Sequence, residues 1–391
     1  MFSQFTWWHI IYLLITTHIT IVTVTVYLHR ALAHRSLSVS KPLEHFFRFW
    51  CWLTTGQNPK EWAAVHRKHH AFCEKEGDPH SPKLFGIWNV LFKGVILYKK
   101  EANNPETIKR YGHLTPDDNL SKFYSKYSKS GMIGLGVLQV ALFGSHGLWI
   151  LFLQLAWIPF WAAGVVNGIG HFKGYRNFNT TDSSTNISPL GLIIGGEELH
   201  NNHHAYPTSA KLSFKWYEFD IGWAWIQLFS LFGLVKVNKI HQLPKIENAP
   251  VELEESFSAM IQNKAYVLKL FYKKTKNEFV KIISDMKQEH KSLQKVSNKE
   301  MQFIYYSDSQ VVLSKDQESI LDLLLQNKIL AYLYSKKQEL LKFWTDRNAT
   351  VQQLKSNFQI WLEENQHSNY QNISESLRNF SYKLSCLKLK K

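Results

Sequence analysis

The chain has 391 residues, a formal net charge of +15 at pH 7 and a hydrophobic fraction of 45%. This length is enough for one membrane unit and a second domain. Three scattered cysteines argue against a disulfide framework or a cysteine-based zinc site, and no dinucleotide fingerprint or iron–sulfur cysteine run occurs. We expect the lysine excess of the C-terminal part to face anionic lipid, and we expect no nucleic-acid partner.

The first apolar run, residues 7–28, is close to the roughly 20 residues that a helix needs to cross a bilayer. No lysine or arginine precedes this run, whereas Arg30, Arg35 and Lys41 follow it closely. Positive residues favour the cytoplasmic side of a span. The pattern therefore predicts an N-terminus outside the cell and a chain that continues in the cytoplasm.

The second apolar run, residues 131–170, contains no charged side chain and is long enough for two spans with a turn near 144–147. Basic residues flank both ends, which predicts a hairpin that starts and finishes in the cytoplasm. Three shorter apolar stretches, at 43–55, 84–98 and 221–237, are expected to be interfacial or buried helices. We therefore predict an all-α integral membrane protein with about three spans and a cytoplasmic helical cap.

Two histidine triplets stand out on the cytoplasmic side. His200, His203 and His204 have i, i+3, i+4 spacing, and His66, His69 and His70 repeat it upstream. On a helix, this spacing places all three imidazoles of a triplet on one face. Imidazole is a common metal ligand, so two such faces predict a shared metal centre.

Further candidate ligands lie near the triplets. His29 and His34 are five residues apart, about 140° around an ideal helix, so we expect the helix to end or unwind between them. His171 follows Asn167 by one turn on the same face. Imidazole ligands suit iron, copper, nickel or zinc, and the ligand type alone does not choose among them. Four carboxylates are expected to accept the second ring N–H of these ligands: Glu61, Asp78, Glu197 and Glu198.

The composition changes near residue 244, where lysine, glutamate, glutamine and asparagine alternate with periodic leucine, isoleucine and tyrosine. Apolar residues recur there at steps of three and four, which predicts helices with one buried face. The predicted domains are a membrane-embedded unit at 1–243 and a C-terminal cytoplasmic helical region of unknown role at 244–391.

The motifs HRALAH, HRKHH and HNNHH, with flanking EWA, DPHSP, NISP and GGEELH, resemble the membrane-bound fatty acid desaturases of the stearoyl-CoA Δ9 type. The resemblance covers roughly residues 10–240 and is nearest to the bacterial branch, which implies the bacterial inner membrane. It implies two iron ions, with Asn167 holding a metal-bound water, and oxygen-dependent formation of a cis double bond in an acyl chain. Electrons would come from a separate ferredoxin or cytochrome. The implied ligands are nine histidines: His29, His34, His66, His69, His70, His171, His200, His203 and His204.

Two questions stay open at this point. The same motifs are compatible with a related hydroxylase or alkane monooxygenase, or with a membrane metal-binding protein that is not an enzyme. The acyl carrier is also open, because Ala64 and Val65 replace an Arg–Asp pair that faces CoA in the animal acyl-CoA enzymes. The carrier is then either CoA, bound through other bases such as Lys60, Arg67 and Lys68, or a membrane lipid.

Overall fold

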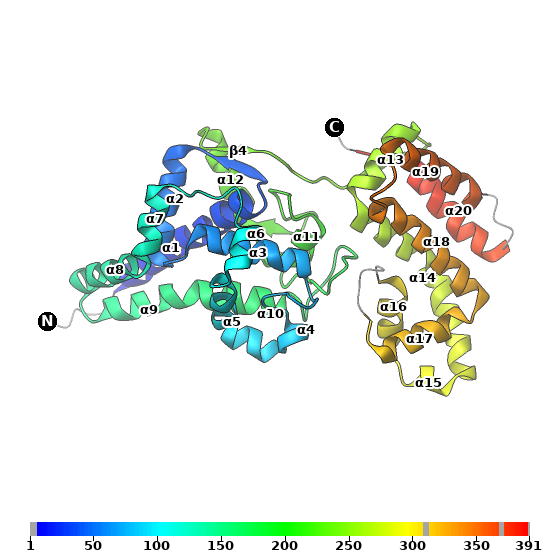
Figure 1. Cartoon of the computed structure of the whole chain (residues 1–391), viewed down its shortest axis with the longest axis horizontal. Helices are drawn as coiled ribbons and strands as arrows, with labels where there is room; N and C mark the ends of the chain where they lie inside the picture. The colour runs from blue at the N-terminus through cyan, green and yellow to red at the C-terminus, as the bar shows by residue number, and fades with distance from the viewer. Residues whose placement is uncertain (1–5, 308–312, 367–370, 390–391) are drawn as a thin grey trace. The chain divides into compact units, whose positions relative to one another are not determined.

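The computed structural model describes residues 6–307, 313–366 and 371–389 (Figure 1). The chain forms two compact units, the first made of Met1–Asn177 and Asp182–His241 and the second of Phe178–Thr181 and Gln242–Lys391. Both units are helical, and the described strands are short pairs of two or three residues. The predicted all-helical class is confirmed.

The long apolar helices of the first unit lie together (Figure 1). Helix α1 (Trp7–Val22) continues into the π-helical segment η1 (Thr23–Ala33), and α8 (Ser128–Phe143) turns at Gly144 into α9 (His146–Ile158), η2 (Pro159–Val166) and α10 (Asn167–Ile169). Among the described residues, two continuous helices are long and apolar enough to cross a bilayer, Trp7–Ala33 and His146–Ile169, and α8 is shorter. A third crossing by α8 stays a prediction.

The helix unwinds into a π-helical segment and ends at Ala33, between His29 and His34, so that expectation is confirmed. In η1 the backbone follows the i→i+5 pattern, and the His34 amide donates to the His29 carbonyl oxygen at 3.0 Å. A wider turn reduces the rotation per residue. The five-residue spacing therefore brings His34, the residue that caps the helix, close to His29, with 4.8 Å between the ring centroids.

Shorter helices complete the first unit. They are α2 (Lys41–Thr54), α3 (Pro59–Phe72), α4 (Pro82–Phe85), α5 (Ile87–Ala102), α6 (Pro105–Tyr111), α7 (Asn119–Lys126), α11 (His200–Ala205) and α12 (Ile221–Leu231). Helix α3 begins where the Asn58 side chain accepts the Lys60 amide and Pro59 supplies a residue without a backbone donor. On α5, Trp88, Phe92 and Ile96 form an exposed apolar stripe, which suits the interfacial position expected for this stretch.

Two strand pairs tie distant segments of this unit. Strand β1 (Leu37–Val39) pairs antiparallel with β4 (Val235–Val237), and β2 (Leu190–Gly191) pairs parallel with β3 (Phe219–Asp220). The apolar core between them is built mainly from the end of α1, from η1 and from α2. Val26 and Leu28, which directly precede His29, are fully buried in it.

The second unit has its own core. It contains β5 (Lys245–Ile246), α13 (Leu253–Gln262), α14 (Lys264–Glu289), α15 (Lys291–Gln294), α16 (Asn298–Tyr306), α17 (Lys315–Leu325), α18 (Lys328–Thr345), α19 (Val351–Gln366), α20 (Gln371–Ser385) and β6 (Leu387–Lys388). Leu, Phe and Tyr side chains from one face of each long helix, such as Phe271, Tyr305 and Leu340, are buried together. The strands β5 and β6 pair antiparallel.

Candidate active site

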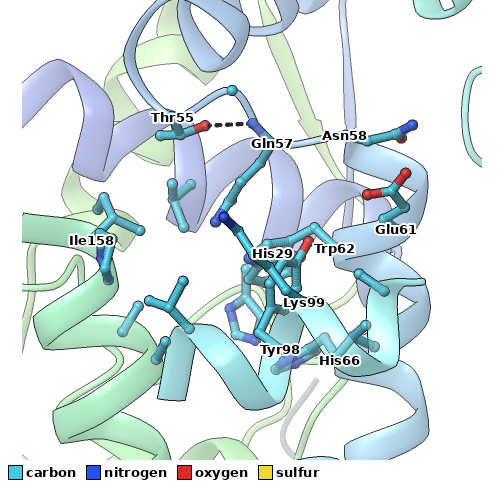
Figure 2. Close-up of a pocket in the computed structure, with 18 of the residues that line it drawn as sticks. His29, Thr55, Gln57, Asn58, Glu61, Trp62, His66, Tyr98, Lys99 and Ile158 are labelled. Carbon is cyan, nitrogen blue, oxygen red and sulfur yellow. Dashed lines mark hydrogen bonds between the residues drawn. The ribbon is translucent and has the colours of Figure 1, made fainter. Parts of the chain in front are cut away.

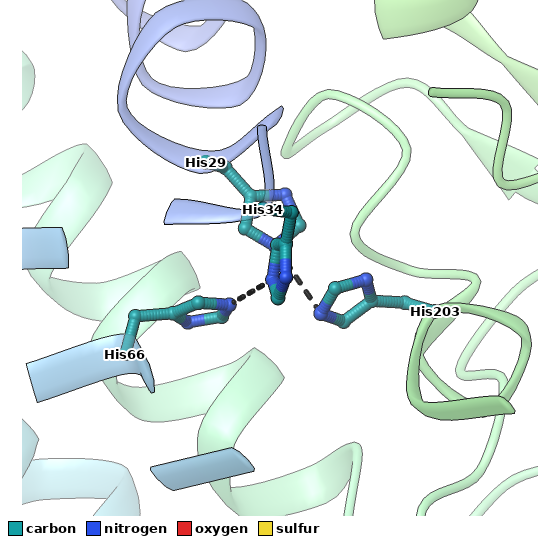
Figure 3. Close-up of side chains that lie close together, drawn as sticks. All are labelled: His29, His34, His66 and His203. Carbon is teal, nitrogen blue, oxygen red and sulfur yellow. Dashed lines mark hydrogen bonds between the residues drawn. The ribbon is translucent and has the colours of Figure 1, made fainter. Parts of the chain in front are cut away.

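Five histidines direct their Nε2 atoms at one point. The Nε2 atom of His203 lies 3.2 Å from that of His29 and 2.8 Å from that of His70. The Nε2 atom of His66 lies 2.8 Å from that of His34 and 3.1 Å from that of His70. Figure 3 shows four of these side chains, which come from η1, from its C-cap His34, from α3 and from α11. We call His29, His34, His66, His70 and His203 the five-histidine group.

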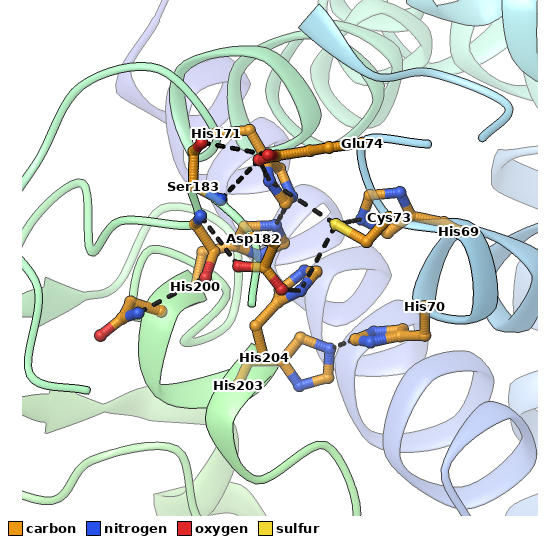
Figure 4. A network of polar contacts seen from close by, with 12 residues as sticks. His69, His70, Cys73, Glu74, His171, Asp182, Ser183, His200, His203 and His204 are labelled. Atoms are coloured by element: carbon orange, nitrogen blue, oxygen red, sulfur yellow. Dashed lines mark hydrogen bonds and ion pairs between the residues drawn. The ribbon is translucent and has the colours of Figure 1, made fainter. Parts of the chain in front are cut away.

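The other four histidines gather beside this group (Figure 4). The Nε2 atoms of His171 and His200 are 3.0 Å apart. The ring of His204 lies 4.5 Å from that of His200, 4.7 Å from that of His171 and 5.2 Å from that of His69, measured between centroids. We call His69, His171, His200 and His204 the four-histidine group. All nine predicted ligands thus lie in two adjacent groups.

Carboxylates occupy the far side of four of these rings. The Nδ1 atom of His69 lies 3.0 Å from Asp78, and that of His29 lies 2.7 Å from Glu197. Two further carboxylates, which the sequence did not reveal, do the same. Glu74 lies 3.1 Å from Nδ1 of His171, and Asp182 lies 3.0 Å from Nδ1 of His204.

These contacts decide which nitrogen is free. An ionised carboxylate only accepts hydrogen bonds, so each paired Nδ1 carries the proton of a neutral imidazole and the Nε2 lone pair is exposed. Two of these free Nε2 atoms face another ring closely: Nε2 of His29 lies 3.2 Å from that of His203, and Nε2 of His171 lies 3.0 Å from that of His200. Ligands about 2.1 Å from a shared metal at right angles would be about 3.0 Å apart. The donor set therefore fits bound metal ions.

Burial keeps most of these imidazoles neutral. Burial and the neighbouring histidines hold the pKa values of His34, His66 and His203 well below the ordinary range. Burial lowers the pKa of His204 to about 4, although Asp182 opposes the shift. Neutral imidazole is the form that binds metal.

Two expected histidine partners were wrong. Glu198 accepts the backbone amides of Ile193, Ile194 and Gly196 instead of a ring N–H, and so shapes the turn before α11. Among the described residues Glu61 has no hydrogen bond or ion pair with a histidine, and its carboxylate lines a cavity (Figure 2). Burial raises the pKa of Glu61.

Asn167 and two unpredicted residues complete the surroundings. Asn167 lies at the end of η2 and lines the same cavity as His200. The ring of His80 lies 4.3 Å from that of His69. The Cys73 sulfur lies 3.9 Å from His69, His171 and His204. Cys73 has no second cysteine at metal-ligand spacing, so no motif in the sequence marks it.

A buried arginine connects the first histidine motif to the last. Arg30 donates to the carbonyl oxygens of Gly195 and Ala210 and to the Asp220 carboxylate at 2.9–3.1 Å. Asp220 also caps α12 by accepting the Trp223 amide. We call these hydrogen bonds of Arg30 the arginine fork. Because Arg30 directly follows His29, the arginine fork holds η1 against the segment that leads into α11.

A cavity of about 490 Å³ extends from the histidines between the long helices. His29, His66 and His200 line it near the five-histidine group, and aliphatic residues of α1, α9 and η2 line the rest. Polar side chains border it at the start of α3 and the end of α5, including Asn58 and Lys99 (Figure 2), and Lys129 borders it at the start of α8. Its size and apolar wall fit a long apolar ligand.

Clustered, carboxylate-supported imidazoles beside an apolar cavity are features of histidine-rich metalloenzymes that act on apolar substrates. The profile of the family named fatty acid desaturase matches residues 5–232. The chain belongs to this family, and it is a fatty acyl desaturase. The reading as a metal-binding protein without enzyme activity is therefore wrong.

Relatives of known function agree with this assignment. The chain is 32% identical over 212 residues to an sn-1 stearoyl-lipid 9-desaturase of Anabaena variabilis, covering 54% of this chain and 76% of the relative. It is 33% identical to Delta-9 acyl-lipid desaturase 2 of Arabidopsis thaliana, covering 56% and 70% of the two chains. It is 31% identical to an acyl-CoA 5-desaturase of Anemone leveillei, covering 54% and 65%.

Proposed function

We propose that the two histidine groups hold one iron ion each and that the enzyme forms a cis Δ9 double bond in a saturated acyl chain. The observation that carries the proposal is the set of facing Nε2 atoms, 2.8–3.2 Å apart, with carboxylates on Nδ1 of His29 and His171. Iron with dioxygen supplies an oxidant able to remove hydrogen from an unactivated methylene. The name of the Anabaena relative supports the Δ9 position.

The residues of the chain have separate tasks in this proposal. Asp78, Glu74, Asp182 and Glu197 keep the histidine Nε2 atoms free and aimed at the ions. Asn167, which borders the cavity next to His200, holds a water at the four-histidine group. The aliphatic wall of the cavity aligns the acyl chain past both groups and excludes bulk water.

For the acyl carrier, the contacts of the nearby bases favour a membrane lipid over CoA. The Arg67 guanidinium donates to the carbonyl oxygens of Leu32, Ala33, Tyr111 and His113. Lys60 pairs with Asp117, and Lys68 pairs with Glu101. Ala64 and Val65 are buried, so they do not face a carrier. The three bases that could have compensated for them already have partners.

The membrane arrangement is also part of the proposal. Trp7–Ala33 and His146–Ile169 cross the bilayer, α8 forms the third crossing, and the histidine groups lie on the cytoplasmic face with the N-terminus outside. The flanking basic residues support this orientation. A ferredoxin or cytochrome-type protein supplies the two electrons from the cytoplasm. Assignment to the bacterial branch and the inner membrane rests on the sequence resemblance.

Expression of the full chain in a host without Δ9 desaturation tests the activity. We expect monounsaturated acyl chains in the lipid extract and about two iron ions per protein molecule. The variant His204→Ala should lose the unsaturated product and the iron. The exposed-histidine variant His113→Ala serves as the matched control and keeps both. Hydroxylated chains in place of unsaturated ones would favour the hydroxylase alternative, and a variant His204→Ala that still makes unsaturated chains would refute the site.

A second experiment separates the carriers. Membranes with an electron donor receive labelled stearoyl-CoA while transfer of acyl chains to lipid is blocked. We expect no labelled monounsaturated product until the block is released and label enters phospholipid. Prompt formation of labelled oleoyl-CoA would refute the lipid carrier and leave the desaturase assignment intact.

A further inference from the structure

The cavity beside the histidines opens to solvent through polar residues. Most of the described residues that line it are buried or half-buried, and the exposed ones are Lys99, Asn103 and Lys129. Lys99 lies in the last turn of α5, Asn103 caps that helix, and Lys129 lies in the first turn of α8. We call these three residues the cavity mouth. Figure 2 shows Lys99 among the lining residues, together with Gln57 and Asn58.

The two lysines of the cavity mouth are not neutralised. Among the described residues, neither the Lys99 ammonium nor the Lys129 ammonium has a hydrogen bond or an ion pair, whereas Lys60 and Lys68 of α3 each pair with a carboxylate. Helix α8 also begins without a side-chain cap, so the partial positive charge of its N-terminus adds to the charge of Lys129. An anion at the cavity mouth would therefore meet two free ammonium groups.

Two buried polar atoms that line the same cavity also lack partners. Within the described part of the chain, the Tyr98 hydroxyl and the Gln57 side-chain oxygen are buried without a hydrogen bond. A buried polar group without a partner costs free energy, so these two groups suit a ligand that brings polar atoms into the cavity. The wall toward α1, α9 and η2 is aliphatic. The cavity therefore fits a ligand with one long apolar end and one polar end.

The position of the cavity mouth favours a membrane lipid over a soluble carrier. Lys99 lies one turn after Ile96, the last residue of the exposed apolar stripe on α5. Lys129 precedes the apolar part of α8, the proposed third crossing. Lysines at the ends of interfacial and membrane helices extend their ammonium groups to the level of the lipid head groups. The phosphate groups of membrane phospholipids lie at that level.

We propose that Lys99 and Lys129 bind the phosphate group of a membrane phospholipid whose acyl chain occupies the cavity. Hydrogen bonds from an ammonium group to a phosphate are charge-assisted and strong. The Tyr98 hydroxyl donates to the ester carbonyl oxygen that joins the acyl chain to the glycerol. This inference rests on the proposed function, because it specifies the lipid carrier named there. It makes phospholipids better ligands than glycerolipids without a phosphate.

Lipid binding tests the phosphate site without turnover. The full-length protein in detergent is titrated with distearoyl phosphatidylglycerol, with distearoylglycerol, which lacks the phosphate, and with stearoyl-CoA. Native mass spectrometry measures the bound fraction of each ligand. The wild type is compared with the double variant Lys99→Ala and Lys129→Ala. The matched control is Lys100→Ala, because Lys100 is exposed and adjacent to Lys99 but does not line the cavity.

We expect the double alanine variant to bind phosphatidylglycerol roughly 10–100-fold more weakly than the wild type and to bind distearoylglycerol equally well. Lys100→Ala should bind both lipids like the wild type. Arginine at both positions keeps the charge and should restore phosphatidylglycerol binding. Unchanged affinity for phosphatidylglycerol in the alanine variant, or an equal loss for both lipids, overturns the site. Stearoyl-CoA that binds more tightly than phosphatidylglycerol, and only with both lysines present, overturns the lipid assignment.

Turnover separates this inference from the proposed function. In membranes that contain both lipid classes, the double alanine variant should lose desaturation of phospholipid chains and keep that of neutral glycerolipid chains. A protein that binds phosphatidylglycerol through the two lysines but desaturates no lipid chain would refute the proposed lipid desaturation and leave the phosphate site standing. A protein that desaturates phospholipid chains equally well without the two lysines would refute the phosphate site alone.

Discussion

At the scale of single residues, the acidic partners decide what the histidines are able to do. Asp182 is buried and lies 3.0 Å from Nδ1 of His204, and Asp78 has the same relation to His69. Each carboxylate fixes a tautomer and a ring orientation without touching the proposed ion. The chemistry of the centre therefore depends on residues that are not themselves ligands.

Replacement of Asp182 by asparagine tests this dependence. An amide of the same shape removes the negative charge that favours the Nδ1–H tautomer of His204, so we expect iron affinity to fall roughly 10–100-fold. Iron retained after dialysis against graded chelator concentrations measures the change. Glu61→Gln alters a carboxylate that lines the cavity but contacts no histidine among the described residues, and it should retain iron like the wild type. Equal iron loss in both variants would contradict the assigned partners.

Single residues also show which parts of the site could be predicted from the sequence and which could not. Both triplets were readable because i, i+3, i+4 spacing acts within a single helix. Asp78 was found because it lies nine residues after His69, in the adjacent turn. Asp182 reaches His204 from a loop 22 residues upstream, and no local pattern in the chain encodes such a contact. Glu61 was misassigned because its helical phase points it into the cavity.

At the scale of elements, the arginine fork and the helix ends position the metal ligands. Arg30 of η1 is 1% exposed and holds Asp220, Gly195 and Ala210 together. The Gly196 backbone approaches the same pair so closely that an added Cβ would meet Asp220, and its φ of +97° also favours glycine. The segments that carry the first and the last histidine motifs are therefore held in place by the same Arg30–Asp220 pair.

Replacement of Arg30 by methionine should break this support. It leaves Asp220 buried without its partner, which costs about 3–5 kcal/mol. We expect a lower thermal unfolding midpoint, and we expect iron to be released over the same temperature range. Arg110→Met, at an exposed arginine of α6, is the matched control. An unchanged unfolding midpoint in Arg30→Met would show that the arginine fork does not stabilise the fold.

The helices also close the far end of the cavity. Along α9 the cavity wall ends at Gln154, about 20 Å from Asn167 at 1.5 Å per residue. Gln154 accepts a hydrogen bond from Gln139 at 2.6 Å and donates to Thr16 of α1. This polar bridge between α1, α8 and α9 forms a floor beneath the aliphatic wall.

The floor predicts a limit on acyl chain length. In Gln154→Ala the cavity deepens, so we expect the product profile to shift toward longer chains, whereas Ile21→Phe fills the same end and should shift it toward shorter ones. Gln139→Ala breaks the bridge without changing a lining residue and controls for loss of packing. Gas chromatography of products from mixed chain lengths gives the readout. Active variants with an unaltered profile would refute the floor.

At the scale of the whole molecule, each unit has its own core. The described histidines of the proposed centre all belong to the first unit, and the buried residues of α13–α20 belong to the second. The sequence predicted the composition change and the helical character of the second part. It could not reveal that residues Phe178–Thr181 group with that part, because this grouping depends on contacts far apart in the chain.

Removal of residues 252–391 tests the predicted division. Because no candidate ligand lies in the deleted segment, we expect the truncated protein to insert into membranes and to bind iron at the full-length level. Metal analysis of purified membranes, normalised to inserted protein, measures this. An inserted but iron-free protein would show that the second unit is needed for the centre to form, and the domain boundary would then be wrong.

The facing imidazole nitrogens have a consequence for the lifetime of the enzyme in the cell. His29 and His203 are 174 positions apart in the chain, yet their Nε2 atoms lie 3.2 Å apart. An ion bound between such segments acts as a cross-link, and it stabilises the folded state by an amount that rises with the logarithm of the free ion concentration above Kd. Without the ion this cross-link is lost and local opening is easier, and opened chains are removed by proteases. Iron supply would therefore set the amount of this protein as well as its turnover.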